Sequence, residues 1–161
     1  MAEMMENNIR LNAIGQIEKF PNDVLEVLQE VMDMTRKNHG MILNLALSYG
    51  GRDEIVAATQ KIAAEIQAGR LQPEEITKEV FSNYLYTKGM PEPDLLIRTS
   101  GEMRLSNFLL WQIAYTEIFV TSTLWPEFRR GELIQILHDY QKRERRFGMT
   151  GEQIKKASPR Q

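Results

Sequence analysis

The chain has 161 residues, with 20 basic and 22 acidic side chains and a net charge of −2. This length predicts one domain with a real hydrophobic core, and the balanced charge excludes a surface built chiefly to bind nucleic acid. The absence of cysteine excludes disulfides, thiolate catalysts and thiolate metal sites. Only two histidines occur, His39 and His138, and they are too distant in sequence to predict a zinc site. No apolar run approaches the length of about 18 residues expected of a membrane span, and the start of the chain lacks a secretory signal pattern.

The first part of the chain predicts two strands joined by a helix. Apolar and polar residues alternate over residues 9–13, which predicts a short strand ending at Gly15. A helix is expected to begin with Asn22 as its cap and to stop at Gly40. The mostly apolar run at residues 41–47 predicts a buried strand of a parallel sheet. The side chains expected on the buried face of the helix are Val24, Val27, Leu28, Val31 and Met32.

Two glycines, Gly50 and Gly51, follow the second predicted strand and open the next helix. Glycines at such a place let a backbone approach a phosphate, but the spacing of a dinucleotide fingerprint and the lysine of a Walker loop are absent. A tight strand–helix turn is therefore the favoured interpretation, and a phosphate loop is the alternative. We expect Asp53 to cap this helix and Gly69 to end it. Its buried stripe is predicted to consist of Ile55, Ala58, Ile62 and Ile66.

The second half of the chain continues the alternation around a central strand. The elements expected there are a short helix at 77–86, strands at 95–97 and 118–120, an apolar helix at 108–115 capped by Ser106 and Asn107, and a last helix at 132–143 with Leu133, Ile136, Leu137 and Tyr140 facing inward. This order predicts an α/β fold, with a mostly parallel sheet of about four strands flanked by helices and right-handed crossovers.

A candidate anion site lies between Arg98, where the central strand ends, and Ser106. Arg98 and Arg104 supply guanidinium groups, and the predicted helix after Ser106 supplies free backbone N–H groups and the positive end of its dipole. Glu117 follows a few residues later. A carboxylate beside an anion site implies a bridging cation, and Mg²⁺ is the ion that joins carboxylates to phosphates. Ligands of parallel sheets bind beyond the carboxyl ends of the strands, where Arg98 is expected.

Each of these residues also has an ordinary structural interpretation. Arg98 at a strand end is commonly a solvated or salt-bridged surface residue, and Ser106 is commonly a helix cap. Glu102 and Arg104 can pair with each other, and Glu117 can pair with any arginine. The combination of these residue types in one short stretch is what favours an oxyanion site over these alternatives.

Several motifs of the chain, in order and spacing, resemble those of the cis-prenyltransferases, and most closely those of bacterial undecaprenyl diphosphate synthase. The resemblance extends from about Asn8 to Gly148. The motifs that carry it are NLALSYGGR at 44–52, DLLIRT at 94–99, SGEMR at 100–104, LSNFLLWQIAYTE at 105–117, LWPEF at 124–128 and RERRFG at 143–148.

The resemblance implies an enzyme, a transferase of isoprenoid metabolism that condenses isopentenyl diphosphate with an allylic diphosphate, usually farnesyl diphosphate, to give a cis-polyprenyl diphosphate. By matching motifs, Arg98, Arg104 and Ser106 bind the diphosphate of isopentenyl diphosphate, and Glu117 helps to bind Mg²⁺. It also implies a cytoplasmic homodimer, and association with a membrane surface is left open because the product is a lipid. Met103 stands where many relatives carry His, which removes any hydrogen bond that this His makes.

The N-terminal loop that carries the family's principal catalytic Asp has no match in the chain, so no catalytic residue is assigned. The resemblance therefore covers about the C-terminal two-thirds of a usual member, truncated at the N-terminus. A truncated product, a mis-started reading frame and one part of a split enzyme are all open. We expect negligible turnover by the chain alone. The alternative function is a catalytically incompetent fragment, or a non-catalytic partner subunit, that retains the isopentenyl diphosphate half-site. Residues 1–161 are expected to form a single domain, with a flexible tail at 149–161.

Overall fold

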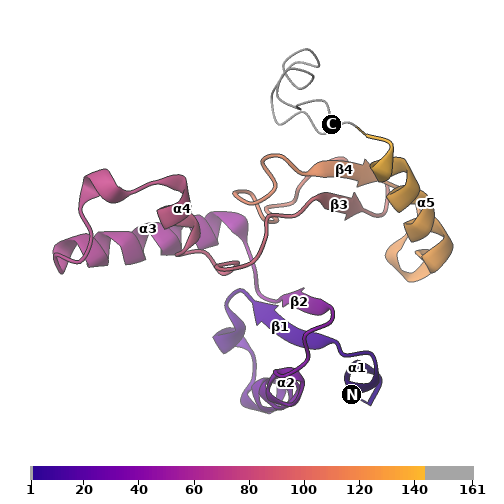
Figure 1. Cartoon of the computed structure of the whole chain (residues 1–161), viewed down its shortest axis with the longest axis horizontal. Coiled ribbons are helices and arrows are strands. Elements are labelled where there is room, and N and C mark those ends of the chain that lie inside the picture. Colours follow the sequence, from indigo (N-terminus) through magenta and orange to yellow (C-terminus); the bar gives the residue numbers. More distant parts are fainter. Residues whose placement is uncertain (1, 144–161) are drawn as a thin grey trace, which may run out of the picture. The chain divides into compact units, whose positions relative to one another are not determined.

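The structure of the chain is a computed structural model that describes residues 2–143 (Figure 1). It divides into two compact units. Within residues 2–143, the first unit contains residues 2–91 and 107–111, and the second contains residues 92–106 and 112–143. The chain therefore passes between the units after residues 91, 106 and 111. The single domain predicted from the length stays a prediction, and the expected tail at 149–161 lies outside the described residues.

The first unit holds one parallel strand pair and most of the helices. Its elements are α1 (Ala2–Glu6), β1 (Arg10–Ile14), the 3-10 turn η1 (Ile17–Lys19), α2 (Asn22–Thr35), β2 (Ile42–Ala46), α3 (Gly51–Gln67), η2 (Pro73–Glu75) and α4 (Lys78–Ser82). β1 and β2 pair in parallel from Arg10 opposite Ile42 to Ile14 opposite Ala46, with α2 as the crossover that packs against β1. The apolar residues buried in this unit are Leu11, Ile14, Ala58, Ile62 and Leu85.

The second unit holds the other strand pair. Its elements are β3 (Leu95–Arg98), β4 (Glu117–Val120), η3 (Trp125–Glu127) and α5 (Arg130–Gln141). β3 and β4 are parallel, with Leu95 opposite Glu117 and Arg98 opposite Val120. The apolar residues buried here are Ile113 and Ile136.

The predicted α/β class is confirmed, and the four predicted strands are all present in parallel pairs. The strands form two parallel pairs, one in each unit. The ladder of hydrogen bonds joins β1 to β2 in the first pair and β3 to β4 in the second. In this part of the chain no helix is both long and apolar enough to cross a membrane.

The helix predicted at residues 108–115 is wrong, because residues 106–115 form turns and bends. The backbone φ angles of Ser106, Asn107 and Leu109 are +50°, +62° and +45°. A right-handed helix cannot contain such residues, since L-residues in that conformation bring Cβ against the following carbonyl oxygen. The predicted caps Asn22 and Asp53 are also wrong, because both lie inside the first turn of their helices and neither helix has a side-chain cap from the residue before it.

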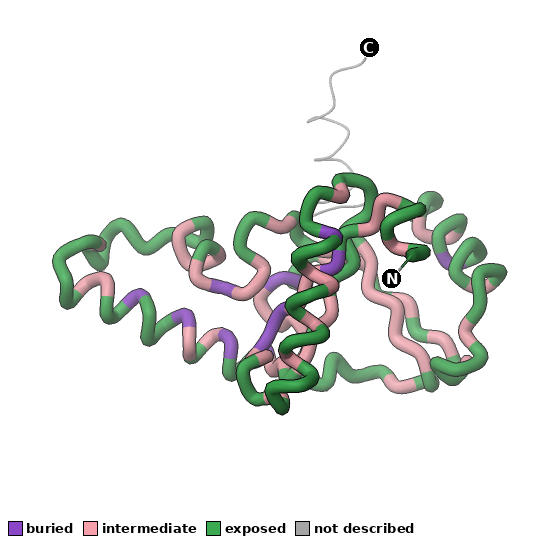
Figure 2. Tube along the Cα trace, turned by 90° about the horizontal axis from the view of Figure 1, so that it is seen from below, coloured by how far each residue is buried: buried purple, intermediate pink, exposed green. Residues whose placement is uncertain are grey.

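The predicted stripe of α3 is confirmed. Ala58 and Ile62 are buried, and Ile55 and Ile66 are half-buried. Figure 2 shows these buried positions recurring along one side of the helix. The stripe begins earlier than predicted, at Glu54, whose side chain is only 2% exposed.

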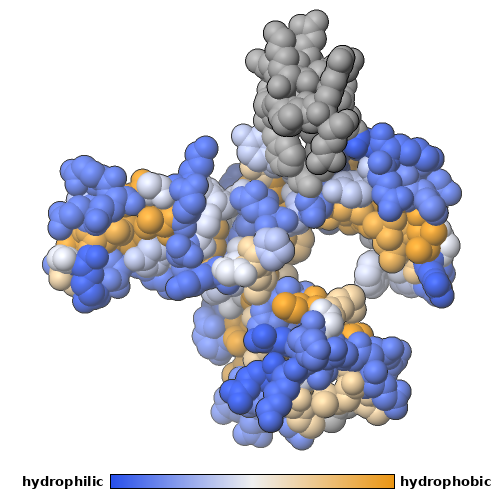
Figure 3. All heavy atoms as spheres, viewed as in Figure 1, coloured by the Kyte–Doolittle hydropathy of each residue, from blue (hydrophilic) through white to orange (hydrophobic). Residues whose placement is uncertain are grey.

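The predicted burial of β2 is wrong, as is part of the predicted inner face of α5. Ile42 in β2 is 52% exposed. In α5 only Ile136 is buried, whereas Leu133 and Leu137 are exposed. Figure 3 shows this apolar surface of α5 in orange.

The inner face of α2 differs from the predicted one at its start. Val24 and Val27 are exposed, and the buried side instead begins with Leu25 and continues through Leu28, Val31 and Met32 to Thr35. Thr35 is completely buried. Its Oγ1 accepts a hydrogen bond from the Leu11 backbone N–H at 3.0 Å and donates one to the Val31 carbonyl oxygen at 2.8 Å. The hydroxyl therefore joins α2 to the middle of the first sheet.

Replacement of this hydroxyl tests its contribution to stability. Thr35→Val leaves the buried Leu11 N–H without an acceptor, so we expect the free energy of unfolding to fall by about 1–3 kcal/mol. Thr59→Val is the matched control, because the exposed Thr59 hydroxyl bonds only the Ile55 carbonyl of its own helix. It should change stability by less than about 0.5 kcal/mol in urea unfolding. Equal losses in the two variants would contradict this role of Thr35.

Candidate functional site

A cavity of about 350 Å³ lies on one face of the β3–β4 sheet in the second unit. Its lining residues are Leu96, Arg98, Glu102, Met103, Arg104, Leu105, Ile118 and Val120. Residues two apart on a strand share a face, so Leu96 lies on the same face of β3 as Arg98. The register places Leu96 opposite Ile118 and Arg98 opposite Val120. The floor of the cavity is therefore apolar and ends in a guanidinium group at the carboxyl end of β3.

The loop after β3 forms the other wall because the chain turns back sharply. Ser100 and Gly101 both have a φ of +70°, two consecutive left-handed residues. Their N–H groups donate to the carbonyl oxygens of Thr123 (2.9 Å) and Thr121 (2.7 Å), which fixes the turn against the chain leaving β4. This turn brings residues 102–105 beside the strand face from which Arg98 projects.

Arg98 is half-buried and only partly satisfied. Its Nη2 donates to Ser106 Oγ at 3.4 Å, a long hydrogen bond, and its Nε is buried without a hydrogen-bond partner. An unpaired buried donor costs about 1–3 kcal/mol, and a charged donor costs more. Arg98 is therefore a donor for which the protein itself supplies too few acceptors, which is the expected state of a residue that binds an anion.

Arg104 and Glu102 form an ion pair, as one of the structural interpretations predicted. Both side chains are well exposed, at 64% and 41%, so the pair contributes little to stability and can open. The cavity thus contains two guanidinium groups and one carboxylate, and an anion must compete with Glu102 for Arg104.

Glu117 does not line this cavity. It lies opposite Leu95 at the amino end of the strand pair. Leu95 precedes Arg98 by three residues, so Glu117 lies about 10 Å from the level of Arg98 along the strands. Its Oε2 accepts a hydrogen bond from Arg143 Nη1 at 2.7 Å, and the Arg143 guanidinium lies 3.9 Å from the centre of the Phe119 ring. The structure therefore brings Arg98, Arg104 and Ser106 together and places Glu117 apart from them, in the alternative role of an arginine partner.

The described residues do not form a magnesium site by themselves. Among residues 2–143 there is no group of three or more His, Cys, Asp or Glu side chains arranged to hold a metal ion. Mg²⁺ requires several oxygen ligands at near-octahedral angles, and Glu117 is bound to Arg143. The assignment of Glu117 as a metal ligand stays a prediction.

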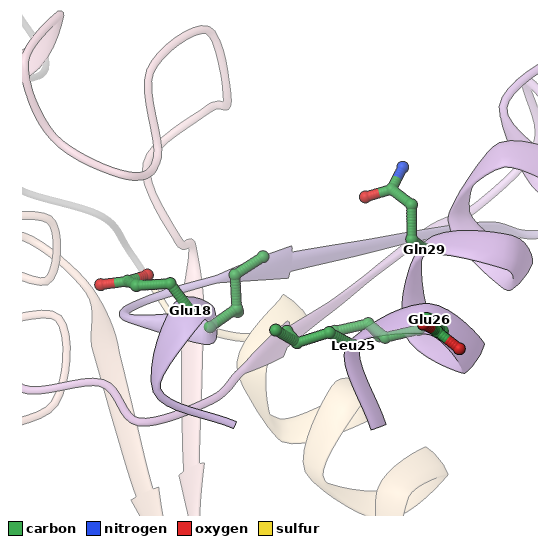
Figure 4. A pocket seen from close by; sticks show the side chains of 6 residues that line it. Glu18, Leu25, Glu26 and Gln29 are labelled. Atoms are coloured by element: carbon green, nitrogen blue, oxygen red, sulfur yellow. The ribbon is translucent and has the colours of Figure 1, made fainter. Parts of the chain in front are cut away.

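A second cavity, of about 390 Å³, lies in the first unit between η1 and α2. Figure 4 shows Glu18 on one side of it, with its carboxylate pointing away from the helix, and Leu25, Glu26 and Gln29 on the other. Ile17 and Leu28 complete the lining, which contains no basic residue. Its two carboxylates repel anions, so this cavity does not suit a diphosphate.

Asn107, from a distant part of the chain, lies against Gly50 and Gly51. The Gly51 N–H donates to the Asn107 carbonyl oxygen at 2.7 Å, and the Arg52 N–H donates to Asn107 Oδ1 at 2.9 Å. A Cβ on Gly51 would lie 2.9 Å from Leu110 Cγ and 3.1 Å from the Asn107 oxygen. The N–H groups that a phosphate would use are already donated, which supports the tight-turn interpretation over a phosphate loop.

Glu54 is a buried carboxylate that sequence analysis missed. Its Oε2 accepts a hydrogen bond from the Tyr49 hydroxyl at 2.6 Å, and its Oε1 accepts one from the Tyr86 N–H at 2.7 Å. Burial is the main cause that raises the pKa of the Tyr86 hydroxyl, and the charges of Glu18 and Glu54 add to it. The sequence did indicate that Glu54 is buried, because it precedes Ala58 by one helical turn and so lies on the buried stripe of α3.

Sequence analysis also missed the apolar floor of the first cavity and the partner of Glu117. Leu96, Ile118 and Val120 were assigned to strands, but the strand register that places them on one face could not be read from the chain. Arg143 belongs to the motif RERRFG at 143–148, and the sequence assigned this residue no function. It is the one residue of that motif within the described range.

Two arginines, Arg98 and Arg104, lie beside an apolar sheet face in this cavity, and comparison with known proteins identifies the family. The family model described as putative undecaprenyl diphosphate synthase matches residues 1–148. The isoprenyl transferase of Chlorobaculum tepidum is 53% identical over 153 residues, and that of Geobacter sulfurreducens is 54% identical over 153 residues. Each alignment covers 95% of this chain, and the chain spans 58% and 62% of these two relatives. The chain belongs to the undecaprenyl diphosphate synthase family, which confirms the resemblance drawn from its motifs.

Two solved structures agree with this assignment. A lavandulyl diphosphate synthase from Lavandula x intermedia, in complex with dimethylallyl diphosphate, has a TM-score of 0.88 and 39% identity. A probable undecaprenyl diphosphate synthase from Campylobacter jejuni has a TM-score of 0.76 and 35% identity. The alignments cover 91% of this chain in both cases, and 64% and 66% of the respective structures.

The close approach at Gly51 gives a prediction. Gly51→Ala forces its new methyl group against Leu110 and the Asn107 backbone, so we expect a loss of about 1–3 kcal/mol in the free energy of unfolding. Gly131→Ala, in α5, is the control, because a Cβ there meets nothing within 4 Å. It should be neutral or stabilising by up to about 1 kcal/mol. Denaturant melts that show no loss for Gly51→Ala would mean that Asn107 does not lie against this glycine.

Proposed function

We propose that this chain provides the isopentenyl diphosphate site of an isoprenyl transferase, which condenses isopentenyl diphosphate with an allylic diphosphate such as farnesyl diphosphate to give a cis-polyprenyl diphosphate. The observation that carries the proposal is the composition of the cavity on the β3–β4 sheet. Arg98 and Arg104 supply positive charge at one side, and the floor is apolar. This division matches a ligand with a dense anionic head and a short hydrocarbon chain.

The arginines would bind the diphosphate through charge-assisted hydrogen bonds. The fork of a guanidinium group fits phosphate oxygens, and the unpaired Nε of Arg98 gains the acceptor it lacks. Ser106 Oγ, now at 3.4 Å from Arg98 Nη2, can donate its own proton to the same oxygens. Leu96, Ile118 and Val120 would cover the hydrocarbon, at about 0.8 kcal/mol for each buried methylene group.

The role proposed for these residues in the reaction is positioning. The condensation forms a carbon–carbon bond from the double bond of isopentenyl diphosphate, breaks the allylic carbon–oxygen bond, and releases diphosphate and a proton. Holding the diphosphate of the first substrate fixes where its double bond lies relative to the allylic carbon. Fixed reactants convert a bimolecular step into an effectively unimolecular one, which is a large part of enzymatic rate enhancement.

Other parts of the proposal concern a metal ion and the oligomeric state, which lie outside this cavity. Glu117 would act as a Mg²⁺ ligand only where substrate oxygens or other carboxylates complete the coordination, and only after Arg143 releases it. A homodimer in the cytoplasm is proposed on the family assignment.

Binding of isopentenyl diphosphate tests the proposal directly. Arg98→Ala removes the half-buried guanidinium, so the affinity measured by isothermal titration calorimetry should fall about 10- to 100-fold. Arg130→Ala is the control, because Arg130 is exposed at the start of α5 and outside the cavity lining. It should change the affinity by less than about twofold. Glu102→Gln should act in the opposite direction and strengthen binding, since it frees Arg104. Identical affinities for the wild type and Arg98→Ala would overturn the assignment.

A second candidate function is a non-catalytic partner or fragment that binds isopentenyl diphosphate without reacting. The observation that favours it is that Glu117 is held by Arg143 and no cluster of metal-binding side chains occurs within residues 2–143. Incubation of the purified chain with labelled isopentenyl diphosphate, farnesyl diphosphate and Mg²⁺ separates the two candidates. We expect no elongated product. Long-chain product that disappears in an Arg98→Ala, Arg104→Ala variant would instead show that the chain is a complete catalyst.

A further inference from the structure

A threonine directly after β4 joins two segments of the second unit. The Thr121 hydroxyl donates a hydrogen bond to the Glu132 carboxylate in the first turn of α5, and it accepts one from the Thr123 N–H at 3.2 Å. Thr121 and Glu132 are both half-buried. These residues belong to the second unit, as do all the residues that line the cavity on the β3–β4 sheet. The hydroxyl therefore connects the chain leaving β4 to α5 within one unit.

The chemistry of the three groups fixes the direction of these two hydrogen bonds. A hydroxyl has one proton to donate and lone pairs with which to accept, whereas an ionised carboxylate only accepts. Glu132 therefore accepts the O–H of Thr121, and a lone pair of the hydroxyl faces the Thr123 N–H. A hydrogen bond to an ionised acceptor is about twice as strong as a neutral one, so the hydroxyl has one preferred orientation.

The segment held by this hydroxyl carries the acceptors for the turn after β3. The Thr121 carbonyl oxygen accepts the Gly101 N–H at 2.7 Å. The Thr123 carbonyl oxygen accepts the Ser100 N–H at 2.9 Å. Ser100 has a φ of +70°, a conformation that a residue with a Cβ keeps only where its surroundings fix it. The conformation of the turn therefore depends on the order of residues 121–123.

This turn decides where one wall of the cavity lies. Residues 102–105 line the cavity, and they begin directly after Gly101. The ion pair of Glu102 with Arg104 lies within this segment, so it does not attach the segment to the strands. Arg98, in contrast, is part of β3 itself. The distance between the two guanidinium groups therefore depends on the turn.

We propose that Thr121 is a positioning residue for the diphosphate site, and that Glu132 orients its hydroxyl. This inference rests on the proposed function. Thr121 does not line the cavity, and it binds no ligand in this proposal. Its hydroxyl holds the segment that fixes the turn, and the turn places Arg104 where it and Arg98 can bind the same diphosphate.

Removal of the hydroxyl is expected to weaken ligand binding. Thr121→Val keeps the shape of the side chain but leaves the Thr123 N–H without its acceptor. The affinity for isopentenyl diphosphate, measured by calorimetry, should fall about five- to tenfold, because misplacement of Arg104 weakens a charge-assisted hydrogen bond without removing it. Thr121→Ser keeps the hydroxyl and should stay within about threefold of the wild type. A loss in Thr121→Ser as large as that in Thr121→Val would overturn the inference.

Thr116→Val is the matched control. Thr116 is a half-buried threonine of the same unit, and its hydroxyl donates to the Pro93 carbonyl oxygen at 2.7 Å, at the amino end of the strand pair. This variant should lower the melting temperature, as Thr121→Val does, and leave the affinity within about twofold of the wild type. Affinities are measured at a temperature at which circular dichroism shows every variant folded. Equal losses of affinity in the two variants would overturn the inference.

Glu132→Ala tests the same connection from α5 and leaves Thr121 intact. Without its carboxylate acceptor the hydroxyl is free to turn away from the Thr123 N–H, so the affinity should fall about three- to fivefold. Wild-type affinity in Glu132→Ala, or in Thr121→Val, would overturn the inference.

Inorganic diphosphate separates an effect on the arginines from an effect on the apolar floor, because it has no hydrocarbon chain. Thr121→Val should weaken the binding of inorganic diphosphate and of isopentenyl diphosphate by the same factor, within about twofold. A loss confined to isopentenyl diphosphate would overturn the inference and leave the proposed function standing. A wild-type chain that binds neither ligand would overturn the proposed function, and the inference with it.

Discussion

The parallel pairing of β3 with β4 is the constraint on which the candidate site depends. Its register sets Leu96 beside Ile118 and Arg98 beside Val120, which creates an apolar face with a cation at its carboxyl end. The same register places Glu117 at the other end of the pair, where Arg143 binds it. A shift of β4 by one residue would turn Ile118 and Val120 away from the face that carries Leu96 and Arg98. The hydrogen bonds of a four-residue ladder therefore decide which groups can meet a ligand.

Much of this site could be predicted from the chain, because its determinants are local. An apolar run that ends in Arg98 predicts a strand with a cation at its end, and the Ser100–Gly101 dipeptide predicts the turn that brings Arg104 back towards it. What failed was the helix after Ser106. Its residues have a helical pattern, but Asn107 is held in a left-handed conformation by its bonds to α3, more than fifty residues earlier in the chain. Tertiary contacts of this kind leave no trace in local periodicity.

The buried side chains could be predicted only where the apolar pattern of an element allows a single arrangement. The apolar stripe of α3 was correctly predicted, although the buried Glu54 was missed because a carboxylate is judged polar until its partners Tyr49 and Tyr86 are known. The strand β2 has the apolar composition of a buried strand, yet Ile42 is half exposed. Periodicity reports which side chains can be buried together, whereas burial itself requires a neighbouring element to cover them.

The central claim is that Arg98 binds the diphosphate of isopentenyl diphosphate, and its unpaired Nε offers the most direct measurement. Nuclear magnetic resonance of ¹⁵N-labelled arginine side chains gives a separate Nε–Hε signal for each slowly exchanging guanidinium, and the Arg98 signal is identified by its loss in Arg98→Lys. We predict that isopentenyl diphosphate shifts this signal to saturation and that the uncharged alcohol isopentenol does not. A signal that stays in place at saturating diphosphate would contradict the account.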